Sequence, residues 1–198
     1  MSAQFFHDDI LFLQRFLSCC GFYSGDLDGL YGPKTSAAEA AFDQASATIA
    51  AQAGSFDARS ETNIRSLQIK AQPLARQSLG KLIQAGHDAR IISGTRSYAQ
   101  QNALYRQGRS NGRPVVTNAR GGQSWHNFGL AWDIGLFDEG AYITDGGPYE
   151  QVSSIAKVAG LEWGGDWPSF RDMPHYQVAT EGRSVSAARI GFEKGCRA

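Results

Sequence analysis

Residues 124–135, SWHNFGLAWDIG, contain an apolar run together with two polar side chains that are unusual for such a run. His126 stands just before the run and Asp133 stands inside it. The apolar and aromatic residues from Leu130 onward predict a buried strand over 130–137. Because a bare carboxylate is costly to bury, Asp133 needs a partner such as an arginine, a set of backbone amides or a metal ion. The alternative interpretation is a structural ion pair for Asp133 and an ordinary hydrogen-bonded His126.

A second pair of polar residues lies near the other end of the chain. Residues 171–177, RDMPHYQ, place Asp172 and His175 three positions apart. On a regular strand this odd spacing would direct the two side chains to opposite faces. Pro174 restricts the residue before it and favours a local turn. We therefore expect a turn that directs Asp172 and His175 toward one site.

His126, Asp133 and His175 would together offer two imidazoles and one carboxylate. This donor set is typical of a catalytic zinc site that keeps its fourth position for water, and we expect one zinc ion. Zinc lowers the pKa of a bound water toward about 7, so a carboxylate is basic enough to accept its proton. Asp172 is the remaining carboxylate and is the candidate general base.

The strings SxHxxGxAxD, from Ser124 to Asp133, and DxxH, from Asp172 to His175, resemble those of the VanY-like zinc peptidases. This group includes D-Ala-D-Ala carboxypeptidases and the L-alanyl-D-glutamate endopeptidases of phage endolysins and bacterial autolysins. The flanking text IISGTRSYAQQNALYRQGR, VTNARGGQSWHNFGLAWDI and EWGGDW is similar to the endopeptidase branch over roughly residues 55–178. The resemblance implies an α+β catalytic domain of the Hedgehog-like zinc peptidase type.

The resemblance also implies roles for single residues. It assigns the metal to His126, Asp133 and His175 and proton transfer to Asp172. Arg96 would stabilise the oxyanion, which suits a fixed and permanently charged guanidinium; a surface arginine at a helix start is the alternative. Ser124 would support the site by hydrogen bonding.

Two tryptophans are candidate substrate contacts. Trp125 is adjacent to His126 and is the better placed of the two. Trp163 belongs to the EWGGDW segment, and core packing is an equally good interpretation for it.

The N-terminal segment resembles a different family. Residues 13–42, LQRFLSCCGFYSGDLDGLYGPKTSAAEAAF, are similar to a peptidoglycan-binding domain of the three-helix type, over about residues 9–44. Asp28 and Tyr31 in its glycine-rich loop are candidate contacts to the cell wall. A calcium loop is not indicated, because the glutamate and spacing of an EF-hand are missing. We expect a peptidoglycan-binding helical module over 1–52 and a zinc peptidase domain over 53–198, with 52–60 as the connection.

Apolar spacing and turn residues predict the secondary structure. Helices are expected over 8–20, from Pro33 or Thr35, around Ile64 and Leu67, and over 73–85, 97–107 and 150–159. Strands are expected over 89–93 and 130–137, and strand or loop pieces over 161–167 and 175–178. Helices and strands mix without a regular βαβ rhythm, which favours the α+β class.

Composition excludes several partners. Among 198 residues, Lys plus Arg and Asp plus Glu number 19 each, so the basic surface of a nucleic-acid-binding protein is not expected. No apolar run is long enough for membrane insertion, and the N-terminus lacks the basic start of a signal peptide. Cys19, Cys20 and Cys196 have neither metal-ligand spacing nor an even count, so we interpret them as unpaired thiols or small buried side chains.

The sequence therefore predicts a monomeric peptidoglycan hydrolase. It would be synthesised in the cytoplasm without a signal peptide and would act on the wall after holin-type release or another form of export. Its substrate bond would be L-Ala–D-Glu in the stem peptide. A D-Ala-D-Ala carboxypeptidase, or a non-catalytic wall-binding protein that retains the zinc site, are the alternatives.

Overall fold

The computed structural model describes residues 7–109 and 115–197. Contacts divide the chain into two compact units. The first contains the described residues of 1–45, 96–128 and 183–198, and the second contains 46–95 and 129–182. The predicted boundary after residue 52 does not coincide with an edge of either unit, so the functional division at that position stays a prediction.

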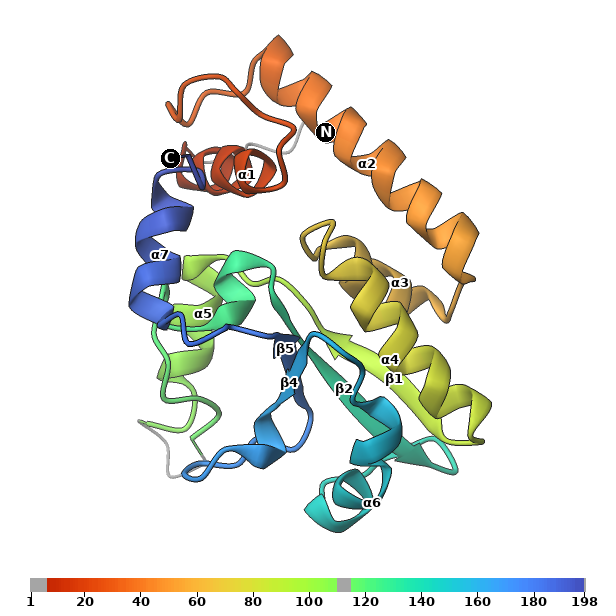
Figure 1. The fold of residues 1–198 in the computed structure, drawn as a ribbon. Coiled ribbons are helices and arrows are strands. Elements are labelled where there is room, and N and C mark those ends of the chain that lie inside the picture. Colours follow the sequence, from red (N-terminus) through yellow and green to blue (C-terminus); the bar gives the residue numbers. More distant parts are fainter. Residues whose placement is uncertain (1–6, 110–114, 198) are drawn as a thin grey trace. The chain divides into compact units, whose positions relative to one another are not determined.

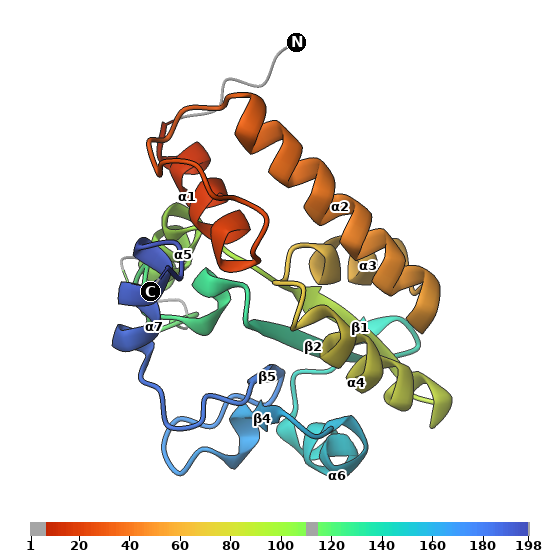
Figure 2. The same ribbon diagram turned by 45° about the horizontal axis from the view of Figure 1, so that its top comes forward.

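The first unit is helical (Figure 1). Its helices are α1 (His7–Cys19), the first half of α2 (Pro33–Ala53), α5 (Tyr98–Arg106), the short 3₁₀ helix η1 (Trp125–Phe128) and α7 (Val185–Glu193). Helices α5 and α7 lie side by side in both ribbon views (Figures 1 and 2). The ring centroids of Tyr98 on α5 and Phe192 on α7 are 6.3 Å apart. Phe192 also packs on Phe12 of α1, at 5.3 Å between ring centroids, and on Phe128 of η1, at 5.5 Å.

The second unit combines an antiparallel sheet with helices. The strands are β1 (Asp88–Ser93), β2 (Ala131–Asp138), β3 (Ala141–Tyr142), β4 (Leu161–Trp163) and β5 (His175–Val178), and the sheet order is β1-β2-β5-β4, with β3 paired to β2. The helices are α3 (Ala58–Arg65), α4 (Gln72–Gln84), α6 (Gly146–Ala156) and the short η2 (Gly164–Asp166). This mixture of helices and antiparallel strands confirms the predicted α+β class.

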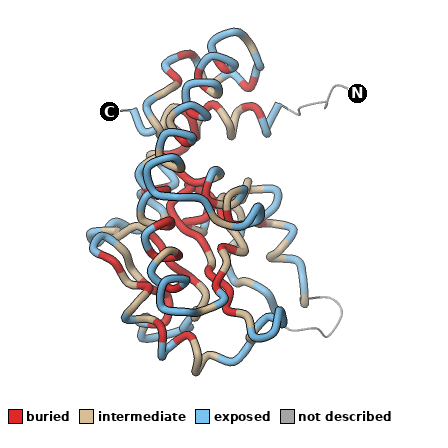
Figure 3. Tube along the Cα trace, turned by 90° about the vertical axis from the view of Figure 1, so that its right-hand side faces the viewer, coloured by how far each residue is buried: buried red, intermediate tan, exposed pale blue. Residues whose placement is uncertain are grey.

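One apolar core holds the second unit together. Fully buried side chains from α3, α4, β1 and β2 meet in it, among them Ile64, Leu79, Ile91 and Trp132. Buried and exposed positions alternate along the helices (red and pale blue in Figure 3), as expected when each helix buries one face. Strand β2 is central in this sheet, so a polar group on it is held by neighbours on both sides.

Several helices differ from the prediction: α3 ends at Arg65, before Leu67, and the 3₁₀ helices η1 and η2 were not predicted. The helix expected over 150–159 spans Gly146–Ala156, because the side chain of Asp145 accepts a hydrogen bond from Gly147 N–H and caps an earlier start. Helix α7 was not predicted; Ser184 caps it by accepting from Ala187 N–H, and Ala188 and Phe192 form its buried face. In α6 and α7 a cap residue sets the helix start, which apolar spacing alone does not reveal.

The interpretation of all three cysteines as unpaired is wrong. Cys19 and Cys196 form a disulfide, with their Cα atoms 4.8 Å apart. The 177 residues that separate them in sequence hide the pairing. Within the first unit, Ser18 also donates its hydroxyl to the carbonyl of Gly195 at 2.7 Å, so several contacts hold the C-terminal segment against the end of α1.

Candidate metal centre

Asp133 and His175 face each other across the pairing of β2 and β5. They are direct partners in the antiparallel register, and Nδ1 of His175 lies 3.4 Å from Oδ1 of Asp133. The exposed fractions of the two side chains are 17% for Asp133 and 7% for His175. The sheet therefore brings together two of the predicted metal ligands, which are 42 positions apart in the numbering.

A tight turn precedes His175, as its sequence predicted. The carbonyl of Asp172 accepts a hydrogen bond from His175 N–H at 3.3 Å, and Asp172 N–H donates to the carbonyl of Gly164 at 3.1 Å. A Cβ atom on Gly164 would lie 2.5 Å from the Asp172 carbonyl oxygen, so only glycine permits this approach. The turn brings Asp172 beside His175, where its negative charge acts on the imidazole.

His126 lies on η1, the last element before the chain enters β2. The carbonyl of Ser124 accepts from Asn127 N–H at 2.9 Å and closes this turn. Gly129 follows with φ of 68°, a left-handed conformation that suits glycine. His126 itself is only 1% exposed. These backbone contacts do not involve the hydroxyl of Ser124, so its supporting role stays a prediction.

Asn127 ties the backbone of Arg96 to the histidine turn. Arg96 N–H donates to the carbonyl of His126 at 3.1 Å, and Nδ2 of Asn127 donates to the carbonyl of Arg96 at 2.9 Å. Oδ1 of Asn127 accepts from Gly122 N–H at 2.9 Å. Sequence analysis did not select Asn127, which is fully buried; its place between His126 and Phe128 is the signal that could have identified it. The backbone of Arg96 is thus fixed beside that of His126.

His126, Asp133 and His175 make up a group that could hold a metal ion. One ligand atom from each lies within 4.8 Å of the other two. Two imidazoles and a carboxylate are the donors of a typical catalytic zinc site. The 3.4 Å separation of Nδ1 and Oδ1 also fits a metal, because two electron-pair donors face one another closely only when a cation or a proton lies between them. The residues present therefore fit the expected zinc ion.

Two opposing effects act on the pKa of His175. Burial by itself would lower it, but the facing carboxylate of Asp133, with a smaller contribution from Asp172, outweighs burial and raises it. The negative charge that favours an imidazolium here would equally favour a bound cation.

A series of hydrogen-bonded polar groups continues from His175 on the side of the ring away from Asp133. Its Nε2 atom lies 3.0 Å from Oε1 of Gln177, and Nε2 of Gln177 donates to Oε2 of Glu162 at 2.8 Å. Sequence analysis missed both Gln177 and Glu162. Position 177 is two residues from His175 and so shares its face of the strand, a spacing that could have identified it.

The two candidate tryptophans lie in different settings. Trp163 is 4% exposed, belongs to the apolar core of the second unit and donates its indole N–H to the carbonyl of Met173 at 2.8 Å. Trp125 is 8% exposed, and the guanidinium of Arg183 lies 5.5 Å from its ring centroid. These contacts fit a structural position for Trp163, and substrate contact by either residue stays a prediction.

The glycine-rich loop of the N-terminal segment is organised around Gln14. This fully buried side chain donates to Oδ1 of Asp28 at 2.8 Å and to the carbonyl of Leu30 at 3.0 Å. The hydrogen bond from Gln14 lowers the pKa of Asp28. Tyr31 is 44% exposed and donates its hydroxyl to Glu39 at 2.7 Å. Asp28 therefore shapes the loop, while the ring of Tyr31 is partly exposed; wall contact by either residue stays a prediction.

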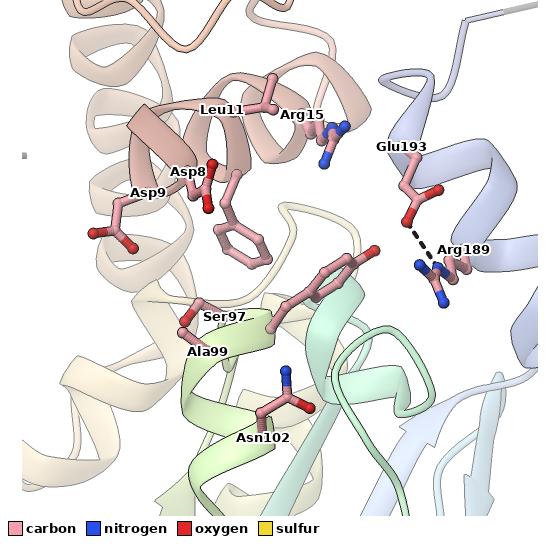
Figure 4. A pocket seen from close by; sticks show the side chains of 11 residues that line it. Asp8, Asp9, Leu11, Arg15, Ser97, Ala99, Asn102, Arg189 and Glu193 are labelled. Atoms are coloured by element: carbon pink, nitrogen blue, oxygen red, sulfur yellow. Dashed lines mark hydrogen bonds and ion pairs between the residues drawn. The ribbon is translucent and has the colours of Figure 1, made fainter. Parts of the chain in front are cut away.

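A cavity of about 410 Å³ lies in the first unit, between α1, α5 and α7. Figure 4 shows its lining, with the ion pair between Arg189 and Glu193 at one side. Asp8 and Asp9 of α1 lie at another side. None of the predicted metal ligands or catalytic residues lines this cavity.

Comparisons with known proteins agree with the geometry. Residues 117–178 match the M15 peptidase model described as D-alanyl-D-alanine carboxypeptidase. Residues 6–47 match the model described as a putative peptidoglycan-binding domain. The first match includes His126, Asp133, Asp172 and His175, and the second includes the loop around Asp28.

Two named relatives are similar over longer stretches. The peptidoglycan L-alanyl-D-glutamate endopeptidase CwlK of Bacillus subtilis (strain 168) is 39% identical over 120 residues, which are 54% of this chain and 72% of that protein. The L-alanyl-D-glutamate peptidase of Listeria phage A118 is 32% identical over 132 residues, which are 64% of this chain but only 43% of that protein. The crystal structure of the L-Ala D-Glu endopeptidase ChiX of Serratia marcescens aligns with a TM-score of 0.49 and 26% identity, over 64% of this chain and 90% of that one.

The chain belongs to the M15 peptidase family, as an L-alanyl-D-glutamate endopeptidase-like metallopeptidase with an N-terminal peptidoglycan-binding domain. The predicted family, enzyme class and general function are thereby confirmed.

Proposed function

We propose that this protein is a zinc-dependent endopeptidase that cleaves the L-Ala–D-Glu bond in the stem peptide of peptidoglycan. The observation that carries the proposal is the group formed by His126, Asp133 and His175, with Asp172 on the turn beside it. The names of the two relatives support the choice of bond.

Three side chains would hold the metal: the imidazoles of His126 and His175 and the carboxylate of Asp133. A bound zinc ion would polarise the scissile carbonyl and make an attacking water more acidic. Both imidazoles are buried, and β2 and β5 fix the positions of two of the three ligands.

Asp172 would act as general base. Its carboxylate would accept the proton of the attacking water and return it to the leaving amine, a role in which a positioned carboxylate is effective. Arg96 would donate hydrogen bonds to the oxyanion that develops on the carbonyl oxygen. The hydrogen bonds of its backbone to His126 and Asn127 support this assignment, because they limit how far Arg96 can move from the histidine turn.

The N-terminal domain would hold the enzyme on its insoluble substrate. Such a tether raises the local concentration of stem peptides, so even a weak interaction of the loop near Tyr31 is useful. We propose that the protein acts as a monomer at the cell wall, after holin-type release or another form of export. Within the part of the chain that the structure describes, no helix has both the length and the apolar character needed to cross a membrane.

Digestion of purified peptidoglycan tests the proposal. Wild-type protein would be incubated with the wall polymer before and after removal of metal by a chelator, and the new termini would be identified by mass spectrometry. We expect new N-terminal D-glutamate, loss of activity on chelation and recovery on addition of zinc.

Other products would change the assignment. Released D-alanine would identify a D-Ala-D-Ala carboxypeptidase, the activity in the description of the matched family model. No new termini from any wall preparation, together with binding to the polymer, would identify a non-catalytic wall-binding protein.

A further inference from the structure

The second nitrogen of the His175 ring is held by a pair of polar residues, of which Gln177 is buried and Glu162 is partly buried. Nε2 lies 3.0 Å from Oε1 of Gln177, which is 2% exposed, and the amide of Gln177 donates to Glu162 at 2.8 Å. Glu162 also accepts hydrogen bonds from the backbone N–H and the hydroxyl of Thr180, at 2.7 and 2.8 Å. All these groups belong to β4, β5 and the residues that follow β5.

Glu162 determines which group donates and which group accepts in these hydrogen bonds. An ionised carboxylate can only accept hydrogen bonds, so Gln177 must present its NH₂ group to Glu162. The amide oxygen of Gln177 then faces His175, and an oxygen can only accept. The Nε2 atom of His175 must therefore carry a proton, so a metal ion can bind this ring only through the lone pair of Nδ1.

We infer that Gln177 and Glu162 are positioning residues that set the tautomer of His175 for metal binding. This inference rests on the proposed zinc site. With the proton on Nε2, the lone pair on Nδ1 is directed to the side of Asp133. With the proton on Nδ1 instead, His175 would donate to Asp133, and this hydrogen bond would compete with the metal for both ligands. Outer partners of this kind commonly orient metal-binding histidines.

The variant Glu162→Gln reverses the direction of the hydrogen bonds that link position 162, Gln177 and His175. It leaves the shape of the side chain at position 162 unchanged. Its oxygen would keep the hydrogen bonds from Thr180, so its NH₂ group would face Gln177. The amide of Gln177 would then turn over and present NH₂ to His175, so Nε2 would have to accept and could no longer carry a proton. We expect the zinc affinity to fall roughly 10- to 100-fold.

The double variant Glu162→Gln with Gln177→Glu restores the original direction. The carboxylate introduced at position 177 would accept from the NH₂ group of position 162 and from Nε2–H of His175. We expect the double variant to recover the wild-type tautomer and most of the zinc affinity, which a role in packing alone would not produce. Glu181→Gln is the control, because it removes the same charge from an exposed position.

Two readouts separate this inference from the proposed function. Long-range ¹H–¹⁵N NMR spectra of the metal-free protein report whether Nε2 of His175 carries a proton, whatever the state of Nδ1, with the signals assigned by a His175→Ala variant. Competition with a chromogenic chelator measures zinc affinity. A proton on Nε2 in the wild type that is absent from Nε2 in Glu162→Gln supports the inference, even if no variant binds zinc and the proposed function fails. A proton that stays on Nε2 in Glu162→Gln overturns it, whatever the zinc affinity.

Discussion

Asp133 and His175 are paired residues on neighbouring antiparallel strands, with Oδ1 and Nδ1 3.4 Å apart in a nearly buried setting. Pairing of the two strands fixes both backbones. The two ligand atoms are therefore held close together by strands and not by a flexible loop. Sites built on strands hold their groups more precisely than sites built on loops. This pair is the rigid part of the proposed centre, and the other residues can be tested against it.

Asp172→Asn should abolish most of the hydrolysis but leave the metal in place. The amide cannot accept a proton from water, so we expect kcat to fall by about 10²–10⁴-fold. Zinc content and the free energy of unfolding should stay close to those of the wild type. Asp138→Asn, at an exposed position, is the matched control. A variant that lost zinc in parallel with activity would show that Asp172 serves the metal rather than the proton transfer.

Arg96→Lys tests the oxyanion role. Lysine keeps the charge but loses the planar set of donors, so we expect kcat to fall by about 10²–10³-fold with little change in zinc content. Arg106→Lys, on the exposed side of α5, should behave like the wild type. Equal activities of the two variants in a stem-peptide cleavage assay would remove Arg96 from the catalytic set.

Glu61→Gln should destabilise the second unit in a pH-dependent way. The Arg76 guanidinium is buried and binds Glu61 through two hydrogen bonds, which lower the pKa of Glu61 below its ordinary value of 4.5. A lowered pKa in the folded state stabilises the protein above the unfolded value, and this contribution is lost as the pH falls through the folded pKa. We expect a loss of roughly 3 kcal/mol at pH 7, because Arg76 is left buried without its partner.

Urea unfolding at several pH values measures this effect. The difference between wild type and Glu61→Gln should shrink as the pH falls below about 4, because protonation removes the same charge from the wild type. A difference that stays constant across this range would show that the ion pair is not its source.

The disulfide makes a separate contribution in the first unit. Replacing both Cys19 and Cys196 with serine should lower the free energy of unfolding by about 2–4 kcal/mol, since the link closes a long loop. A reducing agent should lower the stability of the wild type by a similar amount and leave the double variant unchanged. Cys20→Ser should not change the response to the reducing agent, because Cys20 is outside the disulfide. Equal stabilities of reduced and oxidised wild type would contradict this account.

Local patterns predicted the parts of the fold and site that depend on neighbours in sequence. The apolar run after His126 predicted β2, Pro174 predicted the turn at Asp172, and the helix expected over 97–107 corresponds to α5, which Ser97 caps. The helix expected over 8–20 corresponds to α1, but apolar spacing did not indicate that the polar Gln14 is buried with Ile10 and Leu17.

Features that depend on distant segments could not be predicted in this way. The Cys19–Cys196 disulfide joins opposite ends of the chain, and odd cysteine counts gave no indication of it. The hydrogen bond between Glu162 and Gln177 depends on strand pairing, which places the two residues opposite each other. The spacing of Gln177 from His175 could have indicated its role, but Glu162 has no pattern of its own that does so.

The most direct test of the zinc centre is a crystal structure of the zinc-loaded protein with anomalous diffraction recorded at the zinc edge. We expect one strong anomalous peak, about 2.0–2.2 Å from a nitrogen of His126, an oxygen of Asp133 and Nδ1 of His175. A peak bound by other residues, or zinc-loaded crystals in which His126 points away from Asp133 and His175, would contradict the account.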